Sequence, residues 1–199
     1  MRELVLGLVG LTHSTYEQPL PKRWAAQAAT GHPWKGNPVN GKFHTYPEMA
    51  AAGLWTTAGD LATLGVELLN ILHGKTSKLA LTKATIESML QPQLPHQKVG
   101  IDEFVGLGFF CNGADEAFQF GHAGGDEGFV ALLRIYKNVG KGAVIMLNSN
   151  EGWPLLEELM QAIGKEYQWP GVAPKATASV SLTNPRRYVG QYASKTGEQ

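Results

Sequence analysis

A short segment at residues 121–128 carries the residue types best suited to chemistry in this chain. It reads Gly-His-Ala-Gly-Gly-Asp-Glu-Gly, with an apolar run before it and two strand-like runs after it. Glycine lets another molecule approach the backbone closely, and His122 adds a side chain that titrates near neutral pH. The segment therefore suits a backbone edge that binds a substrate. A Gly-rich hairpin carrying an exposed histidine is the alternative interpretation.

The helices that must position this segment follow from the hydrophobic pattern. Residues 12–52 contain five prolines and three glycines and are expected to be irregular. A helix is predicted to begin after Thr57, whose side chain can cap it, and a second is predicted after Thr82. A last helix, opened by Pro154, is predicted to bury one face, formed by Leu155, Leu159, Ile163 and Tyr167.

Between these helices the pattern is typical of strands. Two-residue alternation and turn residues predict an antiparallel meander of about four strands, at residues 105–110, 117–121, 129–136 and 143–148. Helices on both sides of such a sheet in the sequence make the fold class α+β, an antiparallel sheet flanked by helices. Residues 170–185 are rich in Pro, Ala, Ser and Thr and are predicted to be a linker.

Composition argues against several classes of function. A chain of 199 residues can form one sizeable domain. Lys+Arg and Asp+Glu both total 17, and no long run of either sign indicates binding to nucleic acid or to an anionic membrane. The single cysteine, Cys111, excludes an intrachain disulfide. The apolar run at residues 4–11 is too short to span a bilayer, so we expect a buried strand or helix end rather than a signal peptide.

Three segments carry a family resemblance. Residues 51–62 read AAGLWTTAGDLA, residues 121–129 read GHAGGDEGF, and residues 8–14 read LVGLTHS. They resemble GGLWSTAxDLA, GHxGGxxGF and PLGMxxS of the serine β-lactamase-related family, which includes class C β-lactamases, penicillin-binding-protein-like proteins and esterases. Leu8 replaces the proline of the last pattern. The resemblance covers residues 4–168 and implies the C-terminal part of a β-lactamase/transpeptidase-like αβα sandwich.

The resemblance implies acyl transfer to a serine. In the family a Ser-x-x-Lys supplies the nucleophile, a Tyr-x-Asn relays protons, and a third motif on a strand closes the pocket. It places His122 in the third motif, where it would contact a substrate carboxylate or the tyrosine hydroxyl. It makes the backbone N–H of Gly125 half of the oxyanion hole, with Ala123 and Gly124 binding the substrate. The substrate would be a small ester, amide or β-lactam, and neither a cofactor nor a metal is implied.

The first two motifs are missing. No serine has a lysine three residues later, so this chain contains no candidate nucleophile. Tyr136-Lys137-Asn138 spells the relay but is predicted to be a hairpin turn, and Lys195-Thr196-Gly197 spells a third motif beyond the last helix, by coincidence. Because both missing motifs precede the PLGM segment, we expect a fragment of a serine hydrolase that is inactive alone. The alternative is a non-catalytic truncated or pseudoenzyme binding protein.

The remaining expectations concern organisation and surroundings. Residues 1–169 are expected to be the C-terminal part of a β-lactamase-related domain, and residues 170–199 a linker and the start of a β-barrel domain. An open sheet edge would favour self-association. The family is often exported, but no signal peptide is evident here. Asp126 and Glu127 are expected to face solvent rather than act as a pair. Five side chains could line a pocket or pack within loops: Trp24, Trp34, Phe43, His44 and Tyr46.

Overall fold

The centre of the molecule is a five-stranded antiparallel sheet. The computed structural model describes residues 1–93, 103–172, 186 and 189–190. Each strand pairs with the next one along the chain, in the order β1-β2-β3-β4-β5. The strands are β1 (Glu103–Val105), β2 (Phe110–Asn112), β3 (Gln119–Asp126), β4 (Phe129–Tyr136) and β5 (Lys141–Leu147). The predicted antiparallel meander is confirmed, with five strands in place of about four.

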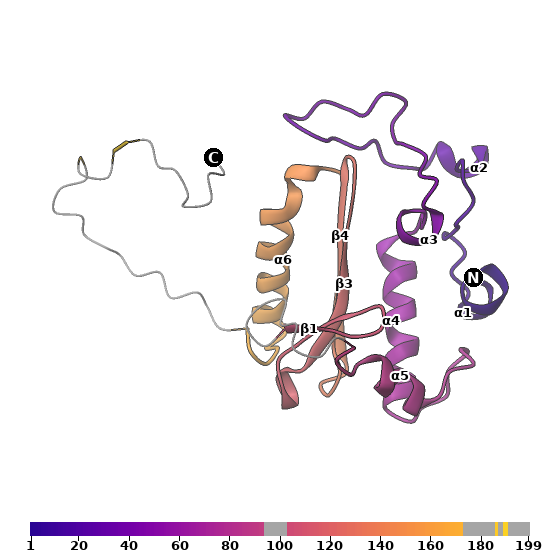
Figure 1. Ribbon diagram of the computed structural model, residues 1–199, viewed down its shortest axis with the longest axis vertical. Helices are drawn as coiled ribbons and strands as arrows, with labels where there is room; N and C mark the ends of the chain where they lie inside the picture. Colours follow the sequence, from indigo (N-terminus) through magenta and orange to yellow (C-terminus); the bar gives the residue numbers. More distant parts are fainter. Residues whose placement is uncertain (94–102, 173–185, 187–188, 191–199) are drawn as a thin grey trace.

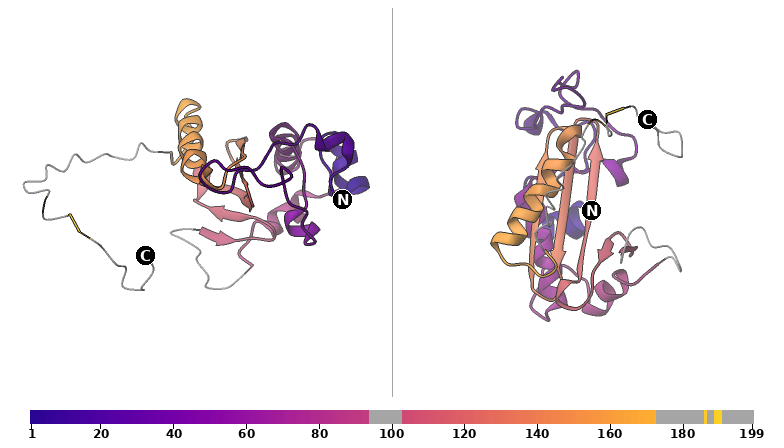
Figure 2. Two further views of the ribbon diagram at one scale, coloured as in Figure 1. Left: turned by 90° about the horizontal axis from the view of Figure 1, so that it is seen from above. Right: turned by 90° about the vertical axis from the view of Figure 1, so that its left-hand side faces the viewer.

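Helices cover both faces of this sheet. Helix α4 (Ala58–Leu72) lies on one side and helix α6 (Trp153–Glu166) on the other, which makes three αβα layers (Figure 1; Figure 2). Alternate residues of β4 face opposite layers: Leu133 and Ile135 pack in the core with α4, whereas Leu132 and Tyr136 pack with α6. The expected α+β class, with an antiparallel sheet flanked by helices, is confirmed.

Shorter helical segments surround these layers. Most of residues 12–52 is irregular, as predicted, and wraps around the end of the sheet where β3 turns into β4 (Figure 1). Thr57 and Thr82 cap α4 and α5 by accepting hydrogen bonds from the backbone N–H of Asp60 and Thr85. The remaining segments are η1 (Arg2–Leu6), α1 (Gly7–Val9), α2 (Lys22–Ala25), α3 (Met49–Ala52), α5 (Lys83–Met89), η2 (Asp115–Ala117) and η3 (Asn150–Gly152).

Two strand boundaries predicted from the sequence are wrong. Residues 106–109 form a turn instead of a strand, closed by a hydrogen bond from the Gly106 N–H to the Phe109 carbonyl, and Gly108 has φ +77°. The strand expected to end at Gly121 continues to Asp126, because β4 pairs with every residue of it. The glycines at 124 and 125 therefore lie within a strand, and the hairpin turn is confined to Glu127-Gly128.

The predicted buried face of the last helix is also wrong, except at Ile163, which is half-buried and packs against the core cluster beside α6. Leu156, Met160 and Gly164 are buried, whereas Leu155, Leu159 and Tyr167 are 49%, 37% and 61% exposed. The stripe that contacts the sheet is thus shifted by one residue from the apolar stripe of the sequence. Gly164 belongs to the buried face because Val172 packs against it, at 2.8 Å from the position of an added Cβ.

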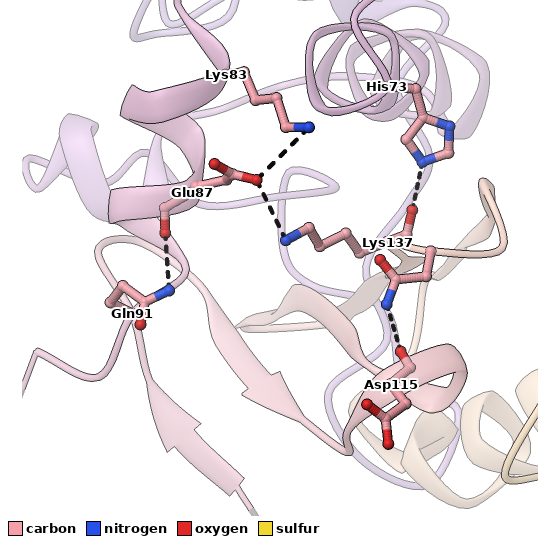
Figure 3. A network of polar contacts seen from close by, with 7 residues as sticks. His73, Lys83, Glu87, Gln91, Asp115 and Lys137 are labelled. Atoms are coloured by element: carbon pink, nitrogen blue, oxygen red, sulfur yellow. Dashed lines mark hydrogen bonds and ion pairs between the residues drawn. The ribbon is translucent and has the colours of Figure 1, made fainter.

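A polar network joins the elements at the end of the sheet farthest from the β3–β4 turn (Figure 3). The Lys137 ammonium lies 3.8 Å from the Glu87 carboxylate of α5. The backbone carbonyl of Lys137 accepts a 2.6 Å hydrogen bond from the His73 ring. Asn138 donates to the Asp115 carbonyl. Tyr136-Lys137-Asn138 is therefore the end of β4 and its turn, as predicted. Most of the predicted linker, and most of residues 187–192, where the notional β-barrel domain would begin, lie outside the described residues.

Candidate active site

The backbone of β3 has one free edge beside the Gly-rich segment. β2 pairs only with residues 119–121 of β3, whereas β4 pairs with residues 119–126. The Lys137 N–H donates to the Phe118 carbonyl, so even-numbered residues of the strand direct their N–H and C=O groups toward β4. The odd-numbered Ala123 and Gly125 therefore direct theirs to the opposite edge, beyond the end of β2.

The side chains of β3 divide between the two faces of the sheet. Phe120 packs in the core with α4, so His122, Gly124 and Asp126 face the α4 layer. Ala123 packs with the α6 cluster, and a Cβ added to Gly125 would lie 3.3 Å from the Trp153 ring of α6. A Cβ added to Gly124 would meet no atom within 4 Å. The strand thus presents open space between His122 and Asp126.

His122 is exposed at the point where β2 ends. Its ring centroid lies 5.2 Å from that of Phe110, and its Nδ1 contacts the carbonyl oxygen of Ala123 on the free edge. A cavity of about 200 Å³ lies along this part of β3 and includes His122 and Ala123 in its lining. An imidazole and two outward backbone groups therefore lie within one short stretch of accessible edge.

The turn after β3 is fixed by close backbone packing. Gly128 has φ +89°, and a Cβ there would lie 2.6 Å from the Gly31 Cα, so this position requires glycine. The Gly128 N–H donates to Asn150 Oδ1 at 2.6 Å, and the Gly128 carbonyl accepts from the His32 N–H at 3.2 Å. The irregular loop of residues 31–46 is thereby held against the end of β3.

Two residues of this loop contact the acidic pair. The Tyr46 hydroxyl accepts a 2.9 Å hydrogen bond from the Glu127 N–H, and the His44 ring lies 3.1 Å from the Glu127 carboxylate. Burial raises the pKa of Asp126 above its usual range. Burial raises the pKa of Tyr46, the hydrogen bond from the Glu127 N–H opposes this shift, and the Asp126 and Glu127 charges add to it. Asp126 is thus half-buried, contrary to expectation, while Glu127 is exposed as expected.

The other aromatic candidates divide between wall and surface. Phe43 stacks edge-on against Trp55 at 4.6 Å between ring centroids, and Trp55 lies 6.1 Å from Phe129 of β4. Trp34 is 63% exposed, and Trp24 packs against His13 far along the loop. The sequence signal that identifies Phe43 and Tyr46 is their position in a long irregular segment beside a Gly-rich strand.

The segment that leads into α4 is held in place by hydrogen bonds from residues 13–15. The Asp60 carboxylate accepts from the Ser14 hydroxyl at 2.7 Å and from the His13 N–H at 2.8 Å. Thr15 and Trp55 exchange backbone hydrogen bonds of 2.9 Å. Two of the sequence segments that carry the family resemblance therefore contact each other, and they hold Trp55 beside the end of β4.

A family model for beta-lactamase matches residues 1–173. The chain belongs to the beta-lactamase family. This assignment agrees with the resemblance carried by residues 8–14, 51–62 and 121–129. No curated protein sequence matches the chain.

Solved structures of beta-lactamase-like proteins share this fold. A structure of SurE superposes with a TM-score of 0.66 at 22% identity, over 84% of this chain and 39% of that one. A class C beta-lactamase mutant superposes with a TM-score of 0.64 at 16% identity, over 82% of this chain and 50% of that one. A penicillin-binding protein from Bacillus halodurans superposes with a TM-score of 0.62 at 20% identity, over 81% of this chain and 48% of that one. At these identities the likeness shows the fold alone, and the chain spans half or less of each structure.

Within the described ranges, no group of three or more His, Cys, Asp and Glu side chains lies close enough together to hold a metal ion. None of the helices described is both long and apolar enough to cross a bilayer.

Proposed function

We propose that this chain forms one wall of the acyl-transfer site of a serine hydrolase, with β3 as the substrate-binding edge. The observation that carries the proposal is the free edge at Ala123 and Gly125, next to the exposed imidazole of His122. A substrate carbonyl that approaches this edge meets outward backbone N–H groups, and no strand of the described residues competes for them. Membership of the beta-lactamase family supports the same reading.

In this proposal each residue of the segment has a separate role. The Gly125 N–H donates to the developing oxyanion, and removal of one such donor typically costs about 10²–10³ in rate. His122 donates to a substrate carboxylate or adjusts the protonation of a catalytic hydroxyl. Gly124 leaves room on the α4 face for the acyl group, in agreement with the open space at its Cβ position.

The nucleophile comes from outside this chain, because none of its serines begins a Ser-x-x-Lys. Ser14 donates its hydroxyl to Asp60 in the first turn of α4, and none of its side-chain hydrogen bonds within the described residues involves a lysine. The substrate is an ester, an amide or a β-lactam, and the complete protein carries the acylated serine.

Covalent labelling tests this division of roles. A fluorophosphonate probe and a penicillin are incubated with the 199-residue chain and with the complete protein that contains it, and adducts are located by mass spectrometry. We expect no stoichiometric adduct on the 199-residue chain, and one adduct on the serine of an upstream Ser-x-x-Lys in the complete protein. Stoichiometric acylation of a serine within residues 1–199 would contradict the proposal.

A second candidate is a non-catalytic binding protein. Another chain could bind to the exposed leucines of α6 and to the outer edge of β5. That edge of β5 has no pairing strand among the described residues. A complete protein that lacks a reactive serine but forms a defined assembly would favour this candidate over the hydrolase.

A further inference from the structure

One face of β3 continues past the candidate oxyanion position to a carboxylate. His122, Gly124 and Asp126 alternate along the strand and share the α4 face. Residues two apart in a strand are separated by about 6.6–6.8 Å, so Asp126 lies one such step beyond Gly124. The position between them is open, since a Cβ on Gly124 would meet nothing within 4 Å.

A chain of aromatic rings begins at the end of this row. Asp126 pairs directly with Phe129, whose ring lies 6.1 Å from that of Trp55. Trp55 in turn lies 4.6 Å from Phe43. Phe43, Tyr46, Trp55 and Phe129 are all half-buried, so each keeps part of its surface accessible. A carboxylate beside aromatic faces is the chemistry that binds an ammonium or quaternary ammonium group.

The neighbouring carboxylate, that of Glu127, already has a partner, whereas the described part of the chain provides none for Asp126. Glu127 contacts the His44 ring at 3.1 Å, and its N–H is held by the Tyr46 hydroxyl. Among the described residues the carboxylate of Asp126 has neither a hydrogen bond nor an ion pair, and burial raises its pKa. A cationic group placed there would compensate the cost of burying this charge.

We propose that Asp126, backed by these aromatic rings, determines specificity by binding a cationic group on the acyl side of the substrate. This inference rests on the proposed function, because it uses Gly125 as the position of the reacting carbonyl. His122 precedes that position and Asp126 follows it, so the two ends of the edge contact different parts of the substrate. The preferred substrate class is a small acyl compound whose acyl chain bears an ammonium or a quaternary ammonium.

The test compares two esters that differ only in charge. The complete protein hydrolyses the p-nitrophenyl ester of a trimethylammonio-alkanoic acid and that of its tert-butyl isostere, and kcat/KM is measured for each. We expect wild type to prefer the cationic ester. Asp126→Asn should lower kcat/KM for the cationic ester roughly tenfold and change the neutral ester by less than about twofold.

Glu127→Gln is the matched control, since it removes the same formal charge one residue farther along. It should leave both esters within about twofold of wild type, because that carboxylate is exposed and paired with His44. Three results would overturn the subsite. Asp126→Asn could lower kcat/KM equally for both esters, the two variants could have equal effects, or wild type could hydrolyse the cationic and the neutral ester with the same kcat/KM.

A binding measurement separates this inference from the acyl-transfer proposal. Tetramethylammonium is titrated into wild type and Asp126→Asn, and backbone NMR shifts of residues 124–129 are followed. Saturable shifts in wild type that are lost in the variant support the subsite even where neither ester is hydrolysed. Their absence in wild type overturns it, whether or not the protein hydrolyses the neutral ester.

Discussion

Gly124 is the residue at which the structural and functional demands on β3 separate most clearly. A larger side chain has room there in the structure, and valine is favoured in strands over glycine. Gly124→Val should therefore leave the free energy of unfolding unchanged or raise it by about 0.5–1 kcal/mol. The same side chain would occupy the space proposed for the acyl group. We expect kcat/KM of the complete protein to fall by a factor on the order of 10–100.

Gly125→Ala provides the control for this prediction. Its methyl group points to the other face of the sheet, 3.3 Å from the Trp153 ring, and its N–H remains on the free edge. Denaturant unfolding should show a small loss of stability, and kcat/KM should change by less than about threefold. If Gly124→Val retained full activity, the acyl group would not lie over this face of β3.

Single residues could be predicted from the sequence where a short motif specified them. The family resemblance assigns His122 and Gly125 to one motif, and both lie on one strand. Asp126 was expected to face solvent, because adjacent acidic residues in a supposed loop usually do. Asp126 pairs with Phe129 and lies close enough to Tyr46 for its charge to raise the Tyr46 pKa, and Tyr46 is far away in the sequence. Local spacing contains no information about such a contact.

At the scale of elements, the short β2 is what leaves the site open. If β2 extended beyond Phe110, it would pair with Ala123 and Gly125 and occupy their outward N–H and C=O groups. Gly106 and Gly108 turn the chain before that happens: a Cβ on Gly106 would lie 2.4 Å from the Met89 carbonyl oxygen, and Gly108 has φ +77°. The turn that was mistaken for a strand is therefore the feature that exposes the edge.

Helix α6 gives a test of which face packs against the sheet. Leu156 is fully buried and Leu155 is 49% exposed, although the two are adjacent and chemically identical. Leu156→Ala should cost about 2–5 kcal/mol of the free energy of unfolding, because it leaves a cavity between α6 and the sheet. Leu155→Ala should cost less than about 1 kcal/mol. Denaturant unfolding of both variants measures the difference, and equal costs would contradict the packing described here.

The sequence predicts the extent of strand β4 better than it predicts which face of helix α6 is buried. Residues 129–136 were predicted to be a strand, and β4 spans the same residues. The sequence also predicts the helix α6, with its start within one residue, but it does not predict which residues of the helix face the sheet. Two apolar stripes run along α6, and the sheet contacts the one that contains Met160 and Gly164. Periodicity alone cannot choose between neighbouring stripes, because the choice depends on what each one meets.

At the scale of the whole molecule, the chain has the three layers of a beta-lactamase-like fold but spans half or less of the similar structures. Two features are left open in the described residues: the outer edge of β5, and the stripe of α6 that contains Leu155 and Leu159. Unpaired strand edges and contiguous apolar residues both favour association with another chain. We therefore expect the 199-residue chain by itself to associate with copies of itself.

Size-exclusion chromatography with light scattering over a range of concentrations measures this association. The mass should rise above that of one chain as concentration increases, and a dye that binds apolar surface should fluoresce with the dilute protein. Replacing Leu155 and Leu159 by lysine should lower both signals without changing the unfolding midpoint, since neither side chain is buried. A matched double variant, Glu158→Gln with Glu166→Gln, makes the same change in net charge at exposed sites of the same helix and should leave the mass unchanged. A chain that stays monomeric at every concentration and binds no dye would mean that these apolar side chains do not drive assembly, and the proposed self-association would be wrong.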